Sequence, residues 1–279
     1  MRGSDDLAEA SASPAHSQLL ALARDVAAQA AEFVHSRRRE GRVTVAATKS
    51  TDTDPVTEID TATELLIRRA ITAVRPGDGF VGEEGGSSEG TSGVSWVVDP
   101  IDGTVNFIYG IPAYAVSIGV EVEGRVVAGV VRNVALGEEY SAVLGGGAVL
   151  TRADGTVVPL HIPELVDLSL ALVATGFGYD AGGRTKQSTA VTALIGQIRD
   201  VRRIGSAALD LCHLASGQVD AYVESGLNAC DIAAGVLVVR EAGGVVTGLD
   251  TDEPDGRLLV AASAPLHADL RAAAAAAGF

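Results

Sequence analysis

Cysteine is scarce in this chain of 279 residues, in which only Cys212 and Cys230 occur. Two thiols cannot form a disulfide framework. The opening MRGSDDLAEASASP lacks the apolar core of a secretory signal. No apolar run approaches the roughly 18 residues that span a bilayer. These absences argue against the disulfide-rich secreted and membrane classes, and they predict a cytoplasmic protein with no membrane partner.

Positive charge is also in short supply. The chain has 21 Lys and Arg against 36 Asp and Glu, a formal net charge of −15. Such a field repels phosphate backbones, so we expect no direct nucleic-acid binding. The basic run Arg37-Arg38-Arg39 ends a predicted helix, where it complements the helix dipole. An acidic protein that handles phosphates usually needs a cation between itself and its substrate.

Apolar residues are plentiful at 47% of the chain, enough for a sizeable core. The length is compatible with two domains or one large one. We expect residues 1–16 to be a mobile tail. Helices followed by antiparallel-looking strands occupy 17–155, and an α/β pattern occupies 156–279, with a soft boundary near 150–165.

The pattern of apolar and polar residues predicts the following elements. Helical spacing covers 17–39, and a second helix is predicted to start at Asp54-Pro55 because Asp is a strong N-cap and Pro suits the first turn. The segment 85–93 has the composition of a polar loop. The other expected elements are strands at 79–84, 94–98 and 169–175, hairpins over 114–133 and 144–162, and helices at 183–199, 205–217, 232–242 and 265–277.

Acidic residues gather where these elements end: Glu83, Glu84, Asp99, Asp102 and Asp231. In DPIDGT (99–104), Pro100 fixes one dihedral and Gly103 frees another, so both aspartates can face one point beyond the strand. Packed carboxylates repel unless a cation lies among them. Oxygen ligands without a His or Cys cluster favour Mg²⁺, or Mn²⁺, over zinc.

Simpler interpretations of the same residues remain open. DPIDGT has the composition of an ordinary Asp-rich turn. Asp231 is a natural N-cap for a helix starting at Ile232. Lys49 is equally well explained as a solvated surface residue.

The motifs taken together resemble the inositol monophosphatase family, within the wider group that includes the fructose bisphosphatases. The resemblance covers residue 17 to the C-terminus and is closest to the bacterial branch of the family. It rests on KSTDTDPVTEID (49–60), GEE (82–84), DPIDGTVNF (99–107), PAYAVSIGV (112–120), RRIGSAALDLC (202–212), CDIAAG (230–235) and EAGG (241–244). DPIDGT is the most specific of these motifs.

The resemblance implies a role for each candidate residue. Metal ligands would be Glu83, Asp99, Asp102, Asp231 and the carbonyl of Ile101. Glu83 and Thr104 would position the attacking water, with Asp60 behind Thr104. Gly103 and Thr104 would offer backbone N–H groups to the phosphate at a helix start. Asp102, Ala207 and Glu224 would contact the substrate, and Lys49 and Glu84 are secondary candidates.

The resemblance also implies a layered α-β-α-β-α fold, a homodimer, and two or three Mg²⁺ ions per active site. The reaction would be in-line attack of an activated water on a small phosphomonoester, without a phospho-enzyme, and inhibition by lithium is expected. Inositol 1-phosphate or a similar polyol phosphate is the expected substrate. Histidinol phosphate, fructose bisphosphate and 3′-phosphoadenosine 5′-phosphate remain alternatives, as does a role as a partner in RNA-polymerase and ribosomal-RNA transcription complexes.

The chain departs from the family pattern at two positions. Cys230 occupies the place where a Trp usually precedes the last metal Asp, and Asn228 occupies a place where animal members often have His. Loss of an aromatic beside a ligand removes bulk and rigidity from its surroundings. The tightness of the metal site and the substrate preference therefore stay open, although no ligand is lost.

Overall fold

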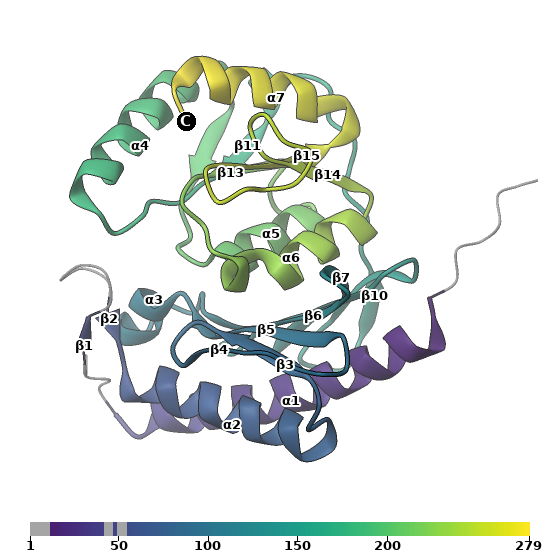
Figure 1. Cartoon of the computed structure of the whole chain (residues 1–279). Helices are drawn as coiled ribbons and strands as arrows, with labels where there is room; N and C mark the ends of the chain where they lie inside the picture. The colour runs from purple at the N-terminus through teal and green to yellow at the C-terminus, as the bar shows by residue number, and fades with distance from the viewer. Residues whose placement is uncertain (1–11, 42–46, 49–54) are drawn as a thin grey trace, which may run out of the picture.

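Helices and sheets alternate in layers in the computed structural model, which describes residues 12–41, 47–48 and 55–279. Figure 1 shows the order α-β-α-β-α, with one helix pair outside each sheet and a third pair between the sheets. This confirms the predicted fold class. The helices are α1 (Pro14–Arg39) and α2 (Glu58–Val74) outside the larger sheet, α5 (Ala207–Ala215) and α6 (Ala229–Glu241) in the middle, α4 (Ala181–Leu194) and α7 (Ala264–Ala277) outside the smaller sheet, and the short α3 (Thr104–Tyr109).

The larger sheet has the order β10-β9-β8-β7-β6-β5-β3-β4. Its neighbouring strands are antiparallel except β3 and β5, which run parallel. Glu123 (φ 52°) and Gly124 (φ 78°) both adopt the left-handed conformation in the predicted β6–β7 turn. The strands are β3 (Gly79–Gly82), β4 (Gly86–Ser88), β5 (Val94–Asp102), β6 (Ala115–Val122), β7 (Arg125–Asn133), β8 (Glu138–Val143), β9 (Gly147–Thr151) and β10 (Val157–Pro159).

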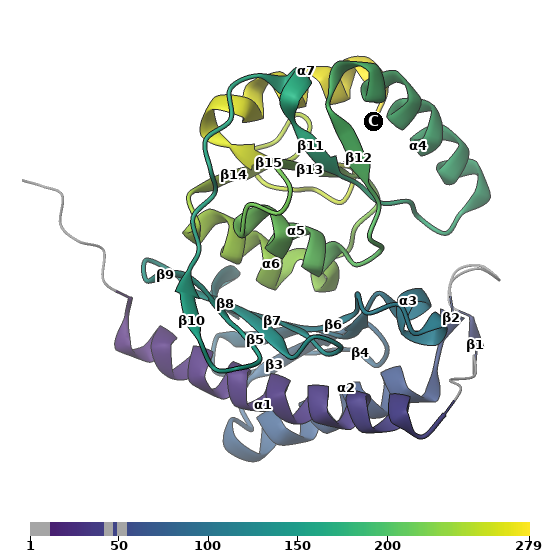
Figure 2. The same ribbon diagram turned by 180° about the vertical axis from the view of Figure 1, so that it is seen from behind.

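The smaller sheet has the order β12-β11-β13-β15-β14. Strand β11 runs parallel to β12 and β13, whereas β15 is antiparallel to β13 and β14. Figure 2 shows this sheet from behind, with α5 and α6 between it and the larger sheet. Its strands are β11 (Leu172–Ala174), β12 (Asp200–Arg202), β13 (Ala221–Glu224), β14 (Gly244–Thr247) and β15 (Leu259–Ser263); β1 (Ala47–Thr48) and β2 (Pro55–Val56) form a separate pair.

The buried side chains follow the same layering. One apolar cluster joins α1 and α2 to the larger sheet, and another joins α4 and α7 to the smaller sheet. The largest cluster lies between the sheets and includes Leu209 and Leu211 of α5 and Val238 of α6. The middle helices are therefore covered on both sides, and their N-terminal ends are held in place by the packing of both sheets.

The predicted start of the second helix was wrong. Helix α2 begins at Glu58, and Pro55 belongs to β2. Thr57 caps the helix together with Asp60: the Thr57 amide donates to Asp60 Oδ2 at 2.9 Å, and the Asp60 amide donates to Thr57 Oγ1 at 3.3 Å. This reciprocal pair satisfies the backbone N–H groups of both Thr57 and Asp60, whereas an Asp side chain acting alone as the N-cap would leave its own N–H without this partner. Asp54 lies outside the described residues.

Several smaller differences concern element boundaries: β5 runs to Asp102 rather than to residue 98, β11 covers only Leu172–Ala174 of the predicted 169–175, and α4 runs from Ala181 to Leu194 rather than over 183–199. Helix α1 starts at Pro14 rather than at residue 17, while residues 1–11 of the predicted tail lie outside the described residues. The predicted loop 85–93 contains β4, which pairs with β3 through Gly82 and Gly86. Helix α6 starts at Ala229, three residues before the predicted Ile232.

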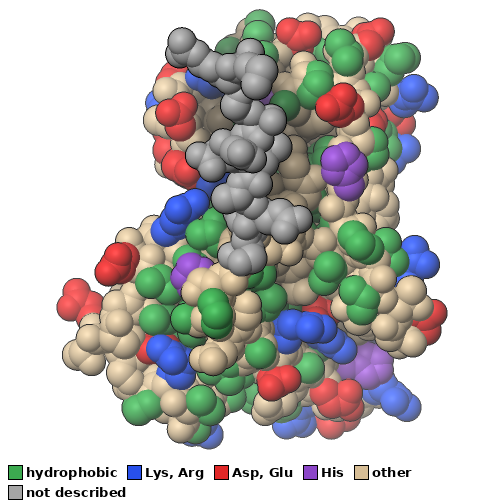
Figure 3. All heavy atoms as spheres, turned by 90° about the vertical axis from the view of Figure 1, so that its right-hand side faces the viewer, with side chains coloured by type: hydrophobic (Ala, Val, Ile, Leu, Met, Phe, Trp, Pro, Cys, Tyr) green, Lys and Arg blue, Asp and Glu red, His purple; other side chains and the backbone are tan. Residues whose placement is uncertain are grey.

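Acidic and basic side chains are interspersed among apolar ones on the face of the molecule drawn in Figure 3. A search of the described helices finds no span long and apolar enough to cross a bilayer.

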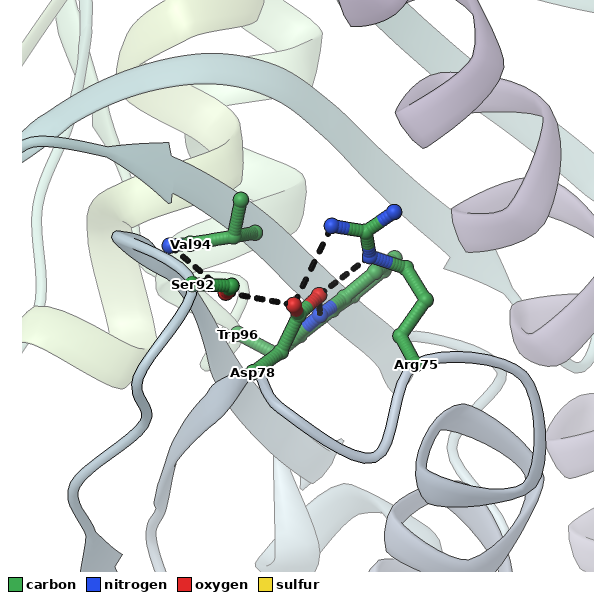
Figure 4. Close-up of polar contacts among 5 residues, drawn as sticks. All are labelled: Arg75, Asp78, Ser92, Val94 and Trp96. Carbon is green, nitrogen blue, oxygen red and sulfur yellow. Dashed lines mark hydrogen bonds and ion pairs between the residues drawn. The ribbon is translucent and has the colours of Figure 1, made fainter.

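Asp78, in the turn between α2 and β3, joins the ends of several elements (Figure 4). Its carboxylate accepts hydrogen bonds from the Trp96 indole N–H (2.9 Å), from the Ser92 hydroxyl (2.6 Å) and from both Nε and Nη2 of Arg75. Burial opposes the charged form, but these hydrogen bonds outweigh it and lower the pKa of Asp78. The network fixes the start of β5, whose far end carries Asp99 and Asp102.

We expect Asp78→Ala to lower the free energy of unfolding by about 3 kcal/mol, because it leaves the buried Trp96 N–H without its acceptor. The pKa of Asp78 is lower in the folded state than in the unfolded state. The stabilisation by the charged carboxylate is therefore present above the unfolded-state pKa and is lost as the pH falls through the folded-state pKa. Urea unfolding at pH 7 measures the difference. The exposed Asp269→Ala should stay within about 0.5 kcal/mol of the wild type; equal losses would contradict the assignment.

Candidate active site

The end of β5 places two aspartates on one side of the larger sheet. Residues three apart on a regular strand point to opposite faces. Here the pairing with β6 shifts register between Asp99, which is opposite Ser117, and Asp102, which is opposite Ala115. The extra residue of this bulge reverses the alternation. The Ile101 amide donates to Asp99 Oδ1 at 3.0 Å and holds the first carboxylate in place.

Three carboxylates from separate elements meet beside this bulge. Single oxygens of Glu83, Asp99 and Asp231 all lie within 4.8 Å of one another. Glu83 follows β3, and its amide donates to the Val98 carbonyl of β5 at 3.2 Å. Burial, followed by repulsion from Glu83, Asp102 and Asp231, raises the pKa of Asp99 well above its ordinary value. This arrangement has the properties of a cation site.

Asp231 is the third residue of α6 rather than its N-cap, so the simpler cap interpretation was wrong. Asn228 occupies the cap position, and its amide donates to Asp231 Oδ2 at 2.6 Å. The helix start therefore orients this carboxylate toward the end of β5. An acidic group in the first turn also complements the helix dipole.

Asp102 stands in the same cavity but outside the closest three carboxylates. Its Oδ2 accepts hydrogen bonds from the Ser206 hydroxyl and from the Ala208 amide (2.8 Å). Burial raises the pKa of Asp102 to about 6 even though these two donors act in the opposite direction. Asp102 thus links the end of β5 to the start of α5, where Ser206 is the N-cap.

Thr104 connects the cavity to a buried aspartate behind it. Its Oγ1 lies 3.1 Å from Asp60 Oδ1 and 3.0 Å from the Ile101 carbonyl. Asp60 is 1% exposed and is fixed by Thr57 through the cap of α2. Gly103 precedes Thr104 with φ 89°, and a Cβ there would come within 2.8 Å of the Ala113 carbonyl. Glycine is therefore required at the turn into α3.

These groups line a cavity of about 590 Å³ between the two sheets. Among the described residues, its wall includes most of the predicted site: Glu83, Asp99, Ile101, Asp102, Gly103, Thr104, Ala207, Glu224 and Asp231. Asp60 does not line the cavity and contacts Thr104 from behind the wall. A larger hollow of about 690 Å³ lies along α6. It lacks the clustered carboxylates, so we place the site in the acidic cavity.

Glu224, at the end of β13, forms the other end of the cavity. The Tyr222 hydroxyl donates to its Oε2 at 2.6 Å. Burial is the main cause that raises the pKa of Glu224 to about 7, against the effects of Tyr222 and Arg203. A Cβ on Gly176 would lie 2.1 Å from Oε2, so a larger residue there would displace this carboxylate.

Glu84, a secondary candidate, does not line the cavity. The Glu84 amide donates to Glu64 Oε2 at 2.7 Å, which ties the GEE turn to α2. Lys49 lies outside the described residues. Cys230 is 6% exposed and packs with Val97 and Ala233. Burial is the main cause that raises the pKa of its thiol to about 12, in keeping with an inert buried cysteine.

Several cavity residues were missed from the sequence. Ser206 could have been found, because Ser before the helical AALDL pattern is an N-cap signal. Gln187 looks like an ordinary polar position of a helix, and no local pattern distinguishes it. The other cavity residues that we did not single out are Gly176, Phe177, Gly178, Tyr179, Asp180, Gly183, Arg203, Gly205, Ser225, Gly226 and Leu227.

The donor set fits a hard divalent cation. Glu83, Asp99 and Asp231 offer carboxylate oxygens, which Mg²⁺ and Mn²⁺ prefer. Among the described residues lining the cavity there are six acids, namely Glu83, Asp99, Asp102, Asp180, Glu224 and Asp231, against one basic residue, Arg203. A cation would relieve this excess of negative charge.

Comparisons with known proteins identify the family. The model of the inositol monophosphatase family matches residues 15–277. This chain belongs to the inositol monophosphatase family. The family is one of phosphatases, so the protein is a phosphatase by family.

Individual members of the family are similar along most of their length. Inositol-1-monophosphatase SuhB of Mycobacterium tuberculosis is 49% identical over 267 residues, which cover 90% of this chain and 91% of that protein. The solved structure of Mycobacterium tuberculosis SuhB matches with a TM-score of 0.80 and 46% identity, covering 94% of this chain and 97% of the other. A protein of Haemophilus influenzae named Nus factor SuhB is 40% identical over 226 residues, which cover 80% of this chain and 83% of that protein.

Asp99→Asn should stabilise the metal-free protein at pH 8 by about 1 kcal/mol, roughly 2–4 °C in Tm, because it removes a buried charge that its neighbours repel. The folded-state pKa of Asp99 is raised, so the wild type loses stability as the pH rises through that value, and the advantage of the variant should shrink near pH 5. Calorimetry in excess chelator measures the Tm difference between the variant and the wild type at pH 8 and at pH 5.

The control for this experiment is the addition of Mg²⁺. The ion should raise Tm of the wild type more than that of Asp99→Asn, since binding to the folded state stabilises it. A variant that is less stable than the wild type at pH 8 in chelator would contradict the repulsion argument.

Proposed function

We propose that the protein is a Mg²⁺-dependent phosphomonoesterase that hydrolyses inositol 1-phosphate or a similar polyol phosphate by direct attack of water. The observation that supports this most is the meeting of Glu83, Asp99 and Asp231 oxygens within 4.8 Å beside Thr104 and Asp60. A homodimer with two or three Mg²⁺ ions per site, and Mn²⁺ as a substitute, belongs to the same proposal.

The charge of the cavity explains why a cation is needed. A phosphomonoester carries up to two negative charges, and the described wall offers Arg203 against six acidic side chains. Glu83, Asp99, Asp102, Asp231 and the Ile101 carbonyl would hold the ions. When bound, divalent ions polarise the phosphate and lower the pKa of a bound water.

Thr104 and Glu83 are placed to orient the water. When the Thr104 hydroxyl donates its single proton to Asp60, 3.1 Å away, its lone pairs are free to accept a hydrogen bond from water in the cavity. Asp60 cannot turn away, because Thr57 holds its other oxygen. Glu83 supplies a second acceptor on the same wall. Two fixed acceptors define one direction for the oxygen lone pair that attacks phosphorus.

The phosphate and the alcohol would occupy different ends of the cavity. Backbone N–H groups of Gly103 and Thr104 at the start of α3, with Asp102 and Ala207 close by, would face the phosphate. Glu224 lies with the wall formed by 176–180 and would accept hydrogen bonds from ring hydroxyls of the alcohol. A carboxylate in this position favours a polyol over a leaving group without hydroxyls.

A second function is favoured by one comparison. The Haemophilus influenzae relative is named as a Nus factor, so a role as a protein partner in transcription is the alternative for this chain. The net charge of −15 disfavours direct RNA contact but not contact with a basic protein. The clustered carboxylates favour the enzyme, since a scaffold does not need them.

Phosphate release should be lost in excess chelator and restored by Mg²⁺, whereas Ca²⁺ should not restore it. Ca²⁺ binds oxygen at about 2.3–2.6 Å rather than 2.0–2.1 Å and takes more ligands, so it misplaces the reacting groups. Release of inorganic phosphate from inositol 1-phosphate measures the effect, and lithium should inhibit it. Full activity in chelator would refute metal dependence.

The same assay with a panel of phosphomonoesters tests the substrate. The panel contains inositol 1-phosphate, histidinol phosphate, fructose bisphosphate and 3′-phosphoadenosine 5′-phosphate. We expect the highest kcat/KM for inositol 1-phosphate. Absence of phosphate release from every member with Mg²⁺ present would favour the transcription role.

Glu224→Gln should lower kcat/KM for inositol 1-phosphate about tenfold, equivalent to about 1.4 kcal/mol, and leave p-nitrophenyl phosphate within twofold. Gln keeps an oxygen for the Tyr222 hydroxyl but loses the charge and one acceptor. Steady-state kinetics on both substrates measure the ratio. If both substrates lost activity equally, Glu224 would serve the metal site or the fold instead of the alcohol.

A further inference from the structure

We propose that Gln187 is a positioning residue that sets the specificity of the cavity for the alcohol part of the substrate. Its side-chain amide ties the segment 176–178 to the loop that follows Glu224. The inference rests on the proposed function, because it assigns the alcohol to the Glu224 end. Nothing in the local sequence around Gln187 indicates this role.

Gln187 lies in the middle of α4 and reaches two segments that are distant in sequence. The Gly178 amide donates to its Oε1 at 3.0 Å. Its Nε2 donates to the Ser225 carbonyl at 3.1 Å and contacts the Ser225 hydroxyl at 3.0 Å. One planar amide thus bridges the turn after β11 and the turn after β13. Gln187, Gly178 and Ser225 all line the cavity.

The bridge controls the surroundings of Glu224 on two sides. Ser225 is the next residue along the chain, so its position sets the end of β13. Gly176 forms a wall against the carboxylate, where even one added methyl carbon would lie 2.1–2.2 Å from its atoms. Because the fit is this close, movement of either segment would shift Glu224 relative to the alcohol.

Both halves of the amide are needed. An amide accepts from Gly178 with its oxygen and donates to the Ser225 carbonyl with its nitrogen at the same time. Met has a similar length and fills the same space, but its thioether is only a weak acceptor and cannot donate. Gln187→Met therefore removes the bridge with little change in volume.

The phosphate end of the cavity is held by other contacts. Asp99 is fixed by the Ile101 amide, Asp102 by Ser206 and Ala208, and Asp231 by the Asn228 amide. None of these contacts involves Gln187. Loss of the bridge should therefore affect recognition of the alcohol and spare the chemistry that all phosphomonoesters share.

Steady-state kinetics with Mg²⁺ test the proposal. Gln187→Met should raise KM for inositol 1-phosphate at least fivefold, with kcat within twofold, and should leave kcat/KM for p-nitrophenyl phosphate within twofold. Gln197→Met is the matched control, since Gln197 is exposed and its side-chain amide donates to the Ala193 carbonyl, one helix turn earlier, at 3.2 Å. Equal changes on both substrates, or no change on either, would overturn the proposal.

Amide hydrogen exchange of the wild type and both variants provides a readout that needs no substrate. The peptide 176–180 should exchange at least fivefold faster in Gln187→Met than in the wild type or Gln197→Met, because Gly178 loses its acceptor. Unchanged exchange would overturn the bridge whatever the substrate.

The two measurements separate this inference from the proposed function. If the wild type releases no phosphate from inositol 1-phosphate, the proposed substrate fails, and the most active hydroxyl-bearing member of the panel replaces it in the comparison. If the wild type hydrolyses no phosphomonoester at all, the proposed function and the specificity role fail together. If the wild type acts on inositol 1-phosphate but the variant keeps the wild-type KM, the inference alone fails.

Discussion

Repulsion between the buried Asp99 carboxylate and its acidic neighbours is the constraint on which the candidate site depends. Asp99 is 2% exposed, and after burial itself the charges of Glu83, Asp102 and Asp231 are what raise its pKa. A fold can keep such a group only if other interactions hold the carboxylates together or a cation neutralises them. Here rigid backbone supplies the first part: Asp99 and Asp102 are on a paired strand, and Asp231 is in the first turn of a buried helix. The arrangement is therefore prepared for a cation by the backbone itself.

The layered fold brings these ends together. Strand β5 ends near the N-terminal ends of α5 and α6, which are packed between the sheets. The Ala208 amide of α5 binds Asp102, and the Asn228 amide before α6 binds Asp231. Helix N-termini present unpaired N–H groups and a partial positive charge, which offset part of the carboxylate repulsion. The middle layer thus has an electrostatic role as well as a packing role.

The sequence allowed much of this to be predicted, for physical reasons that differ between elements. The β6–β7 hairpin was predictable because EG suits a tight turn with positive φ between two apolar strands. The start of α2 was not, because the choice between Asp54 and Thr57 as the cap depends on Asp60, which also accepts from Thr104, 44 residues away. Strand β4 was missed because Gly-Ser-Ser has no apolar pattern, and its pairing with β3 is set by the turn geometry of GEE. The bulge that turns Asp99 and Asp102 to one side depends on pairing with β6, which composition alone does not encode.

The residues of the site also divide into those that the sequence predicts and those that it does not. The carboxylates were predictable because they occur at element ends in a specific motif, and the resemblance to a family added their order along the chain. Gln187 and Gly176 were not, since their importance arises from contacts between segments on different elements. This difference follows from how the two ends of the cavity are built. The end with the clustered carboxylates, where we propose that the phosphate binds, uses strand and helix ends, which constrain the sequence locally. The Glu224 end, where we propose that the alcohol binds, depends on contacts such as those of Gln187 with Gly178 and Ser225, which side chains make across the fold. Under the proposed function, a change at the Glu224 end would alter which alcohol fits without disturbing the carboxylates that would hold the metal, and this separation would give one fold a route to several phosphomonoester substrates.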